Sequence, residues 1–231
     1  MTDPTVIAVD WSGARRPKGI WLAAIRSGRL VESRAVATRE EAVAYVTECT
    51  PPMIAGFDFS FGVPEWFARD NGCADIDDVW DLAARAGDAW LAPTPPFWRD
   101  RCEVPAPQRF RTCEARYPNA KSIFQLVGNG QVGAGSVRGM PLVATMRAAG
   151  IAIWPFDPPS ERTAFEIYPS ALRKHAPQHD VGPWQSNDER DAVVSARVLW
   201  DERETVATSR AATDPTIRLE GDIWAPTPPQ K

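Results

Sequence analysis

The run Val6-Ile7-Ala8-Val9-Asp10 is apolar until it ends on a carboxylate, and two later runs place an acid at or near their ends. They are Met53-Ile54-Ala55-Gly56-Phe57-Asp58 and Ala164-Phe165-Glu166-Ile167-Tyr168. Short apolar runs are typical of buried strands. Strands of one sheet can bring such acids to the same edge, where two carboxylates about 4 Å apart repel by roughly 4 kcal/mol at an effective dielectric near 20. Divalent cations take oxygen ligands and remove this repulsion, so the sequence predicts a metal site.

A further acidic group lies near the carboxyl end of the chain, where Asn187–Val206 has the pattern of a long helix. Asp188 and Asp191 are three residues apart, so they share one face of that helix. Asn187 and Asp188 are also suited to cap the helix. For Asp188, this purely structural role is at least as good an interpretation as a chemical one. Asp191 lies too deep in the helix to cap it and is the stronger candidate for a chemical role.

The first forty residues predict a meander of three strands. Val6–Asp10 is the first strand, and a turn with Gly13 follows it. Gly19–Ile25 and Leu30–Ala37 are then predicted to pair through the short loop Ser27-Gly28, because a two-residue loop with glycine is typical of a β-hairpin.

The next segment predicts a helical crossover to a fourth strand. Thr38 followed by Glu41 has the form of a capping box, and the helix that it begins must end before Pro51-Pro52. Met53–Phe57 is almost wholly apolar, which favours a central parallel strand covered on both faces. The predicted fold class is therefore α/β, with a mixed central sheet, a β-β-β-α-β start and helices on both faces.

The rest of the chain is predicted to complete one domain over residues 1–225, with a long proline-rich insertion near 92–120 and a flexible tail at 226–231. Helices are expected over Asp75–Leu91 and over Ser136–Ala149, the second with Pro141 in its first turns. Strands are expected over Ile151–Phe156 and Ala164–Tyr168.

Composition narrows the possible functions. The chain has 231 residues, 44% of them hydrophobic and 24% charged, with a net charge of −4 and two histidines. A histidine base or a histidine-rich metal site is therefore poorly supported. No apolar run is long enough to span a membrane, and Asp3 argues against a signal peptide, so a cytoplasmic protein without a membrane partner is expected. The four cysteines lack close metal-ligand spacing and are expected to be reduced.

A glycine-rich stretch offers a rival interpretation. Gly128-Asn129-Gly130-Gln131-Val132-Gly133 matches the dinucleotide-binding fingerprint, follows Ser122–Val127 and precedes a predicted helix. Asp157 then stands roughly where a ribose-binding acid would. The stretch lies past the middle of the chain, however, and Gly135 and Gly139 dilute the fingerprint. A loop that touches substrate is the favoured interpretation.

Basic residues gather in the proline-rich segment and predict phosphate contacts. Between Phe97 and Lys121 the chain carries six basic and three acidic residues, with aromatic residues interleaved, and such a mixture can bind phosphates and stack bases. A solvated loop would explain the charges equally well. The predicted substrate-binding residues are Ser12, in the small-residue turn after the first strand, and Arg109, Arg111 and Lys121.

Four motifs together resemble the family catalogued as domain of unknown function 429. They are Ala8-Val9-Asp10-Trp11-Ser12-Gly13, Gly56-Phe57-Asp58-Phe59-Ser60-Phe61-Gly62-Val63-Pro64, Phe165-Glu166-Ile167-Tyr168-Pro169 and Asp188-Glu189-Arg190-Asp191-Ala192-Val193-Val194-Ser195-Ala196. The last motif also resembles the Asp-x-x-Asp-Ala pattern of Holliday-junction resolvases. The family is regarded as predicted ribonuclease H-like nucleases, so the resemblance implies that fold and makes Asp10, Asp58, Glu166 and Asp191 its acidic positions, with Asp188 as a further candidate. Phe59-Ser60-Phe61 departs from the family's usual pattern.

These observations lead to a functional hypothesis. The chain is expected to be a phosphodiester hydrolase that uses Mg²⁺ or Mn²⁺ in a two-metal mechanism and acts on nucleic acid or a nucleotide. The expected catalytic residues are Asp10, Asp58, Glu166 and Asp191, and the expected metal ligands are Asp10, Asp58, Asp188 and Asp191. A nucleotide-binding phosphotransferase of the actin-like and sugar-kinase group, or a non-catalytic binding protein on the same fold, is the alternative. The sequence leaves the oligomeric state open.

Overall fold

The fold is built on one sheet of seven strands. In this computed structural model the described residues are 3–16, 18–92, 94–117, 119–127 and 132–226. The strands are β1 (Thr5–Asp10), β2 (Ile20–Arg26), β3 (Arg29–Val36), β4 (Met53–Phe57), β5 (Ala152–Ile153), β6 (Arg162–Ile167) and β7 (Ile223–Trp224). Their order is β3-β2-β1-β4-β6-β5, and β7 also pairs with β6. β5 and β7 pair with successive parts of β6, so they share the edge that β4 leaves open.

The predicted start of the fold is confirmed. β1, β2 and β3 pair antiparallel, and Ser27 and Gly28 turn the hairpin with φ values of 46° and 75°. Helix α1 (Arg39–Glu48) then crosses over to β4, which runs parallel to β1. The Thr38 side chain caps α1 by accepting from the N–H of Glu41 at 3.0 Å, as the capping box predicts. The Glu41 carboxylate accepts from the N–H of Ala37 at 2.8 Å.

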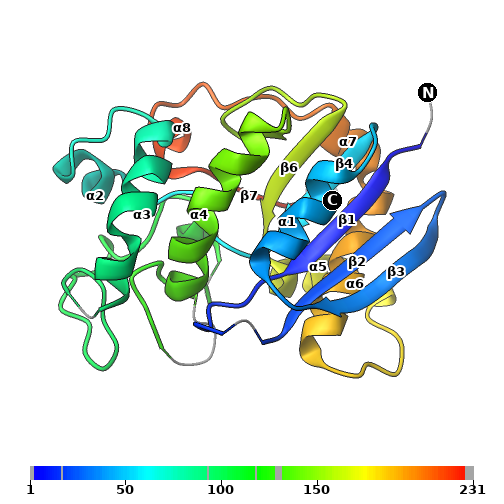
Figure 1. Cartoon of the computed structure of the whole chain (residues 1–231), viewed down its shortest axis with the longest axis horizontal. Helices are drawn as coiled ribbons and strands as arrows, with labels where there is room; N and C mark the ends of the chain where they lie inside the picture. Colours follow the sequence, from blue (N-terminus) through cyan, green and yellow to red (C-terminus); the bar gives the residue numbers. More distant parts are fainter. Residues whose placement is uncertain (1–2, 17, 93, 118, 128–131, 227–231) are drawn as a thin grey trace.

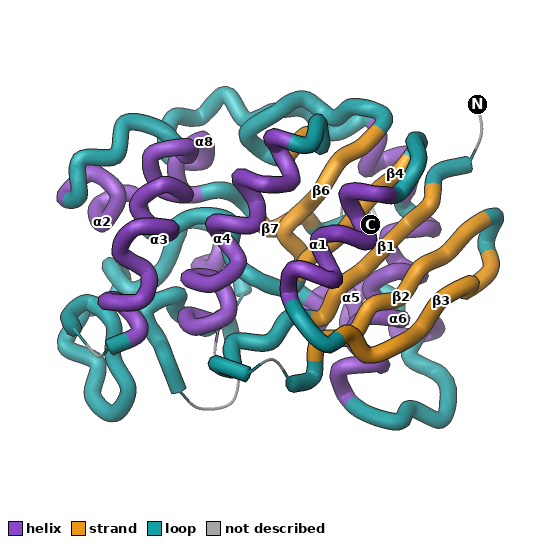
Figure 2. The backbone as a smooth tube through the Cα atoms, in the orientation of Figure 1, coloured by secondary structure: helices purple, strands orange, loops and turns teal. Residues whose placement is uncertain are grey.

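Helices cover both faces of the sheet. In chain order they are α1, α2 (Glu65–Asp70), α3 (Ile76–Leu91), α4 (Val132–Ala148), α5 (Pro169–His175), α6 (Asn187–Asp201), α7 (Arg203–Ala207) and α8 (Ile217–Glu220), with 3-10 turns η1 (Glu114–Arg116) and η2 (Pro177–His179). Figure 1 and Figure 2 show α1 and α4 in front of the strands and α5 and α6 behind them. None of the described helices combines the length and the apolar character needed to cross a membrane.

The alternation of side chains along β1 produces the two cores. Ile7 and Val9 point to the layer of α1, α3 and α4, whereas Val6 and Ala8 point to the layer of α5 and α6. Gly56 of β4 makes room for the Leu199 side chain of α6, because an added Cβ would be 2.7 Å from Leu199 Cδ1. β1 and β4 are therefore buried and apolar on both faces, as expected for central strands of an α/β sheet.

Several predicted boundaries differ from the structure. The strand expected over Ile151–Phe156 is limited to β5, since Pro155 has no N–H for the ladder. The last long helix breaks at Glu202 into α6 and α7. α4 begins at Val132, so Pro141 lies in its interior rather than in its first turns. Short elements that the sequence pattern did not predict are α2, α5, α8 and β7.

Strand order and direction define the fold class. An antiparallel meander β3-β2-β1 continues through β1, β4 and β6, which all run parallel, and helices pack on both faces. This mixed α/β topology is consistent with that of ribonuclease H-like proteins. The arrangement places the carboxyl ends of β1, β4 and β6 side by side at one edge, which is where all three acid-bearing runs end.

Candidate functional site

Asp10 and Asp58 lie beside each other at the ends of β1 and β4. Val9 is the register partner of Phe57, and the N–H of Asp58 donates to the carbonyl oxygen of Val9 at 3.1 Å, one step beyond the ladder. Asp10 is 9% exposed and Asp58 is half-buried. The structure thus brings together the two acids that the sequence predicts as neighbours.

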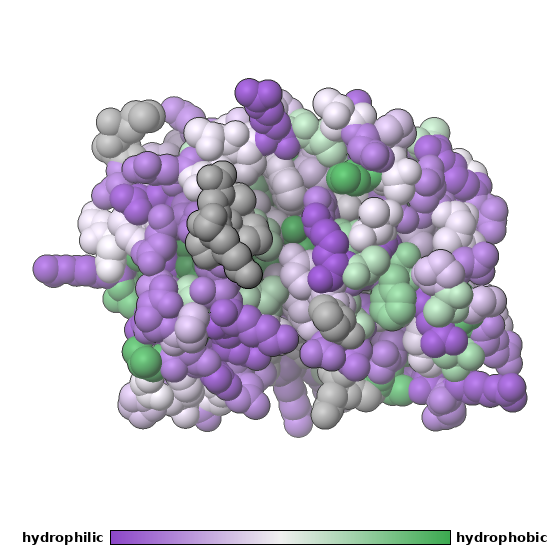
Figure 3. All heavy atoms as spheres, turned by 180° about the vertical axis from the view of Figure 1, so that it is seen from behind, coloured by the Kyte–Doolittle hydropathy of each residue, from purple (hydrophilic) through white to green (hydrophobic). Residues whose placement is uncertain are grey.

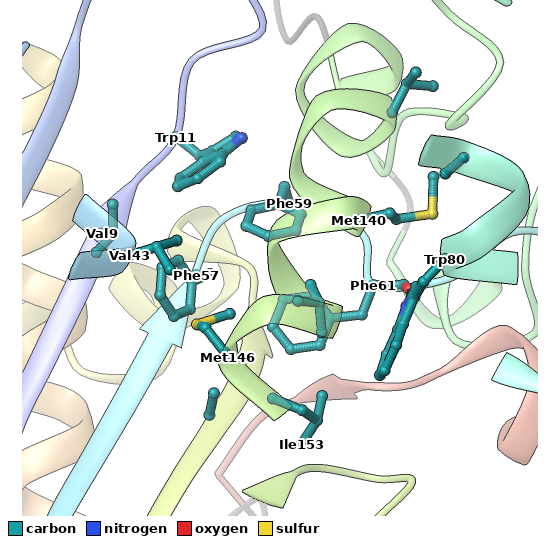
Figure 4. Packing of buried hydrophobic residues seen from close by; sticks show 14 of the residues in the cluster. Val9, Trp11, Val43, Phe57, Phe59, Phe61, Trp80, Met140, Met146 and Ile153 are labelled. Carbon is teal, nitrogen blue, oxygen red and sulfur yellow. Dashed lines mark hydrogen bonds between the residues drawn. The ribbon is translucent and has the colours of Figure 1, made fainter. Parts of the chain in front are cut away.

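A cluster of aromatic rings explains why Asp58 faces the site. Phe57, Phe59 and Phe61 alternate with Asp58 and Ser60, and the three rings point into the core formed with α3 and α4 (Figure 4). The ring centroids of Phe57 and Phe59 are 5.8 Å apart, and those of Phe59 and Phe61 are 5.2 Å apart. The alternation therefore turns Asp58 away from the core. The unusual Phe59-Ser60-Phe61 stretch thus anchors the segment that carries the acid.

The carboxylates of Asp10 and Asp58 have no donor to neutralise them. Among the described residues, neither side chain accepts a hydrogen bond or forms an ion pair. Burial, followed by repulsion from Asp58 and Asp188, raises the pKa of Asp10 well above its ordinary value. Burial and repulsion from Glu166 raise the pKa of Asp58 from 3.8 to about 7. Arg173 opposes both shifts, yet it does not cancel them.

Asp188 approaches the same pair from the first turn of α6. The cap of that helix is Ser186, whose hydroxyl accepts from the N–H of Glu189 at 3.0 Å, so Asp188 is free of the capping role. Burial raises the pKa of Asp188, and its charge adds to that of Asp10. An added Cβ at Gly19 would lie only 2.4 Å from Asp188 Oδ2, so glycine is required where the chain enters β2.

Asp191 lies one turn further along α6 and forms an ion pair with Arg173 of α5. Both side chains are 22% exposed. The Nη2 of Arg173 also donates to the hydroxyl of Ser170 at 3.2 Å. Sequence reasoning missed Arg173. The signal that could have found it is Pro169, because proline is favoured at the first position of a helix and here begins one directly after β6.

Glu166 is held by a buried arginine instead of facing Asp10 and Asp58 as a free ligand. Arg111 is fully buried and donates to Glu166 through both terminal nitrogens, at 2.8 Å from Nη1 to Oε2. The N–H of Phe61 also donates to Oε2, at 2.9 Å. Burial raises the pKa of Glu166, and Arg111 offsets part of this rise. The sequence predicts Glu166 as a catalytic residue, but both of its oxygens are engaged by these donors.

Arg111 is closed to substrate, contrary to the prediction that it binds phosphate. Its remaining donors go to Glu114 Oε1 at 3.0 Å, the carbonyl oxygen of Glu220 at 3.0 Å and the hydroxyl of Ser60 at 3.1 Å. Together with Glu166 these partners use the five N–H groups of the guanidinium. Arg111 therefore joins the proline-rich insertion to β6.

The other residues predicted to contact phosphate differ in where their side chains lie. Arg109 donates to the carbonyl oxygen of Val104 at 2.5 Å, within its own loop. The Ser12 hydroxyl accepts from the N–H of Ala14 at 3.3 Å and so helps to form the turn after β1. Lys121 is exposed and lines the same cleft as Asp58. Lys121 is thus the predicted basic residue that the structure places beside the acids.

Two adjoining clefts lead to the carboxylates. The first has a volume of about 300 Å³ and is lined by Asp58, Asp191 and Lys121. The second has a volume of about 470 Å³ and is lined by Arg173, Lys174 and Arg190. They share three wall residues, Asn119, Tyr168 and Ser170. Figure 3 shows a mainly hydrophilic surface with small separate apolar areas on the face behind the sheet, the side of α5 and α6.

The dinucleotide-binding interpretation finds no support in the described residues. Gly128–Gln131 lie outside them, and Ser122–Val127 forms turns and one isolated bridge instead of a strand. Gly133 is needed for packing, because an added Cβ would be 2.2 Å from the carbonyl oxygen of Ile123. Asp157 pairs with Arg147 and accepts from the N–H of Ile153 at 3.0 Å, so it stabilises the β5 region.

The donor set suits a hard divalent cation. Asp10, Asp58 and Asp188 offer carboxylate oxygens at one edge of the sheet, and Mg²⁺ is commonly bound by one or two carboxylates with water and substrate oxygens completing its shell. Within the described ranges, no three His, Cys, Asp or Glu side chains form a ready-made metal site. Asp191, which would extend the set, is engaged by Arg173.

Comparison of the chain with protein-family models, with curated proteins and with solved structures finds no match. The residues at the sheet edge and the ribonuclease H-like topology are therefore the basis for any functional conclusion.

Proposed function

We propose that this protein is a phosphodiester hydrolase of the ribonuclease H-like superfamily, with Asp10 and Asp58 as ligands of Mg²⁺ or Mn²⁺ and Asp188 and Asp191 as further candidates. Membership of the family that its motifs resemble, domain of unknown function 429, is part of this proposal. A bound ion would lower the pKa of an attacking water and stabilise the leaving oxygen. The observation that carries the proposal is that Asp10 and Asp58 lie side by side and that no described residue donates a hydrogen bond to them or forms an ion pair with them.

The raised pKa values support a cation in this position. A carboxylate that loses hydration gains free energy from an ion pair, a hydrogen bond or protonation, and the described residues offer Asp10 and Asp58 neither of the first two. Divalent ions compete with those protons, so the same residues that hold protons in the free protein would hold the ion when it binds. Burial raises the pKa of Glu166 in the same cleft as well, but the oxygens of Glu166 accept hydrogen bonds from Arg111 and from the N–H of Phe61.

The basic wall of the clefts supports a phosphodiester substrate. Lys121 on one side and Lys174 on the other flank the acids, and phosphate groups are bound by such side chains, whereas Arg190 of the second cleft pairs with Asp180. Tyr168 stands between the two clefts and offers an aromatic surface. The net charge of −4 is no obstacle, because the local field at the site steers a polyanion.

Cleavage assays on purified variants test this function. Wild type is incubated with Mn²⁺ and a panel of single-stranded DNA, duplex DNA, RNA and RNA–DNA hybrid, and we expect cleavage of at least one of them. Asp10→Asn and Asp58→Asn are expected to lose about a hundredfold or more of this activity, since the metal site contributes several kcal/mol to the transition state. Asp81→Asn, on the exposed face of α3, is the matched control.

Unchanged cleavage in both Asp10→Asn and Asp58→Asn would overturn the assignment of the site. Tight ATP binding by wild type without cleavage of any nucleic acid would favour the phosphotransferase alternative. If the wild-type protein bound no divalent cation, the alternative of a non-catalytic binding protein on the same fold would be favoured.

A further inference from the structure

Arg173 lies against the carboxylate cluster on the side of the second cleft. It forms an ion pair with Asp191, and its charge also acts on Asp10 and Asp58, whose pKa values it lowers. Among the described residues it is the cation that acts on both acids. An organic cation therefore already supplies part of the charge that the cluster requires.

The ion pair with Arg173 keeps Asp191 out of the metal set. A carboxylate oxygen that accepts from a guanidinium has to give up that bond before it can enter the shell of a divalent ion. In the described residues Asp191 is bonded to Arg173, and no complete set of three metal ligands is assembled. The ion pair with Arg173 therefore competes with any metal ligation by Asp191.

The second cleft offers the Arg173 side chain an alternative position. It lines the second cleft together with Lys174 and Arg190, and it is partly exposed there. Its second contact, with the hydroxyl of Ser170, is a single hydrogen bond of 3.2 Å. Rotation of the side chain would present the planar fork of the guanidinium to the cleft, and that fork matches the geometry of a phosphate.

We propose that Arg173 is the resident counter-cation of the cluster and a switch between two states of the site. In the metal-free state it neutralises Asp191. With a divalent ion held by Asp10 and Asp58, Asp191 would be released from Arg173 to join the ligands, and Arg173 would turn into the second cleft and bind a substrate phosphate there. This inference rests on the metal site of the proposed function and assigns a substrate-positioning role to Arg173.

Calorimetric titration with Mn²⁺ alone tests the competition. Arg173→Gln removes the competing charge, so its affinity for Mn²⁺ is expected to rise about tenfold, which corresponds to about 1.4 kcal/mol. Arg173→Lys keeps the charge without the fork and is expected to lie between wild type and Arg173→Gln. Arg34→Gln is the matched control, since Arg34 pairs with Glu32 and Glu41, which lie outside the cluster, and its affinity for Mn²⁺ should stay at the wild-type value.

A crystal structure with Mn²⁺ tests the displacement directly. We expect the Arg173–Asp191 pair to be broken and the guanidinium to lie in the second cleft. In Arg173→Gln the affinity of the Mn²⁺-loaded protein for an oligonucleotide should fall, although its affinity for Mn²⁺ rises. A general loss of stability would not change the two affinities in opposite directions.

Two results would overturn the inference and leave the proposed hydrolase standing. One is a Mn²⁺ affinity that Asp10→Asn abolishes but that Arg173→Gln and Arg173→Lys leave unchanged. The other is a Mn²⁺-loaded structure in which Arg173 still pairs with Asp191. Absence of Mn²⁺ binding in wild type and in every variant would overturn both proposals together.

Discussion

Individual acids at the sheet edge differ in what their oxygens contact. This difference distinguishes an acid that stabilises the fold from the acids that we propose as metal ligands. Glu166 accepts from Arg111 and from the N–H of Phe61, so it is fully bonded. Asp10 and Asp58 have no such donors among the described residues, and their pKa values are raised. At this scale the number of donors around a carboxylate is more informative than its position in a motif.

The glycine beside Asp188 provides a prediction at the same scale. Gly19→Ala should strain the backbone at φ of 72° and push Asp188 out of place, because the new Cβ would be 2.4 Å from Oδ2. We expect a loss of roughly 1–2 kcal/mol in the free energy of unfolding. Mn²⁺ affinity measured by calorimetry should also fall about fivefold, equivalent to about 1 kcal/mol.

Gly72→Ala is the matched control for this prediction. Gly72 has nearly the same backbone, with φ of 80°, but nothing lies within 4 Å of an added Cβ. It should show the same loss of stability and a wild-type affinity for Mn²⁺. Equal affinities in the two alanine variants would show that Asp188 does not take part in metal binding.

The sequence predicts Asp10 and Asp58 because each terminates an apolar strand, and their register is a consequence of parallel pairing. It could not predict that Glu166 would be bonded by Arg111, which is 55 residues away along the chain. Nor does local pattern show that Arg173 would face Asp191, since that contact depends on how α5 packs on α6. The role of each of these acids depends on which polar group it meets in the folded chain. The hydrophobic periodicity of the sequence carries no information about such long-range pairs.

At the scale of elements, Arg111 bonds the insertion between α3 and α4 to the sheet at a buried point. Arg111 enters from the insertion and bonds Glu166 of β6, Ser60 after β4 and the carbonyl oxygen of Glu220 at the end of α8. These contacts connect the insertion to three parts of the fold. The described part of this proline-rich loop, which contains the short 3-10 turn η1, is joined to the fold through these bonds.

Removal of the Arg111 side chain should lower the free energy of unfolding. Arg111→Met leaves Glu166 and Glu114 buried without their partner, and breaking a buried ion pair costs roughly 3–5 kcal/mol. Chemical denaturation should show this loss in the free energy of unfolding. Double substitution to Arg111→Met with Glu166→Gln is expected to recover part of it, because one buried charge is removed.

Arg116→Ala is the control, since Arg116 pairs with Asp222 at the surface and its side chain is 52% exposed. We expect a change below about 1 kcal/mol, as for other exposed ion pairs. Similar losses in Arg111→Met and Arg116→Ala would contradict the role given to the buried network.

Element prediction from the sequence succeeds where hydrophobic pattern and capping agree. β1 to β4, α1 and α3 are found close to their expected bounds, and each has a clear turn or cap beside it. The short elements α2, α5, α8 and β7 carry too few residues to establish a period. Their existence depends on what they pack against, such as β6 for β7.

At the scale of the whole molecule, the acidic edge makes stability depend on pH. A carboxyl whose folded pKa is raised above its unfolded value holds a proton that the unfolded chain has already released. Its contribution to stability is present below the unfolded pKa and is lost as pH rises through the folded pKa. For Asp58 this window runs from 3.8 to about 7, and Asp10, which is raised in the same direction, adds to it.

The most direct test of this account is the free energy of unfolding measured against pH with and without Mn²⁺. Without metal, wild-type stability is predicted to fall between about pH 5 and about pH 8, and Asp58→Asn should flatten this fall. With Mn²⁺, wild type should be stabilised at about pH 8 but not at about pH 5, because protons hold the ligands at low pH. A flat wild-type profile, together with a Mn²⁺ effect that is the same in Asp58→Asn, would contradict the claim that Asp10 and Asp58 form a cation site.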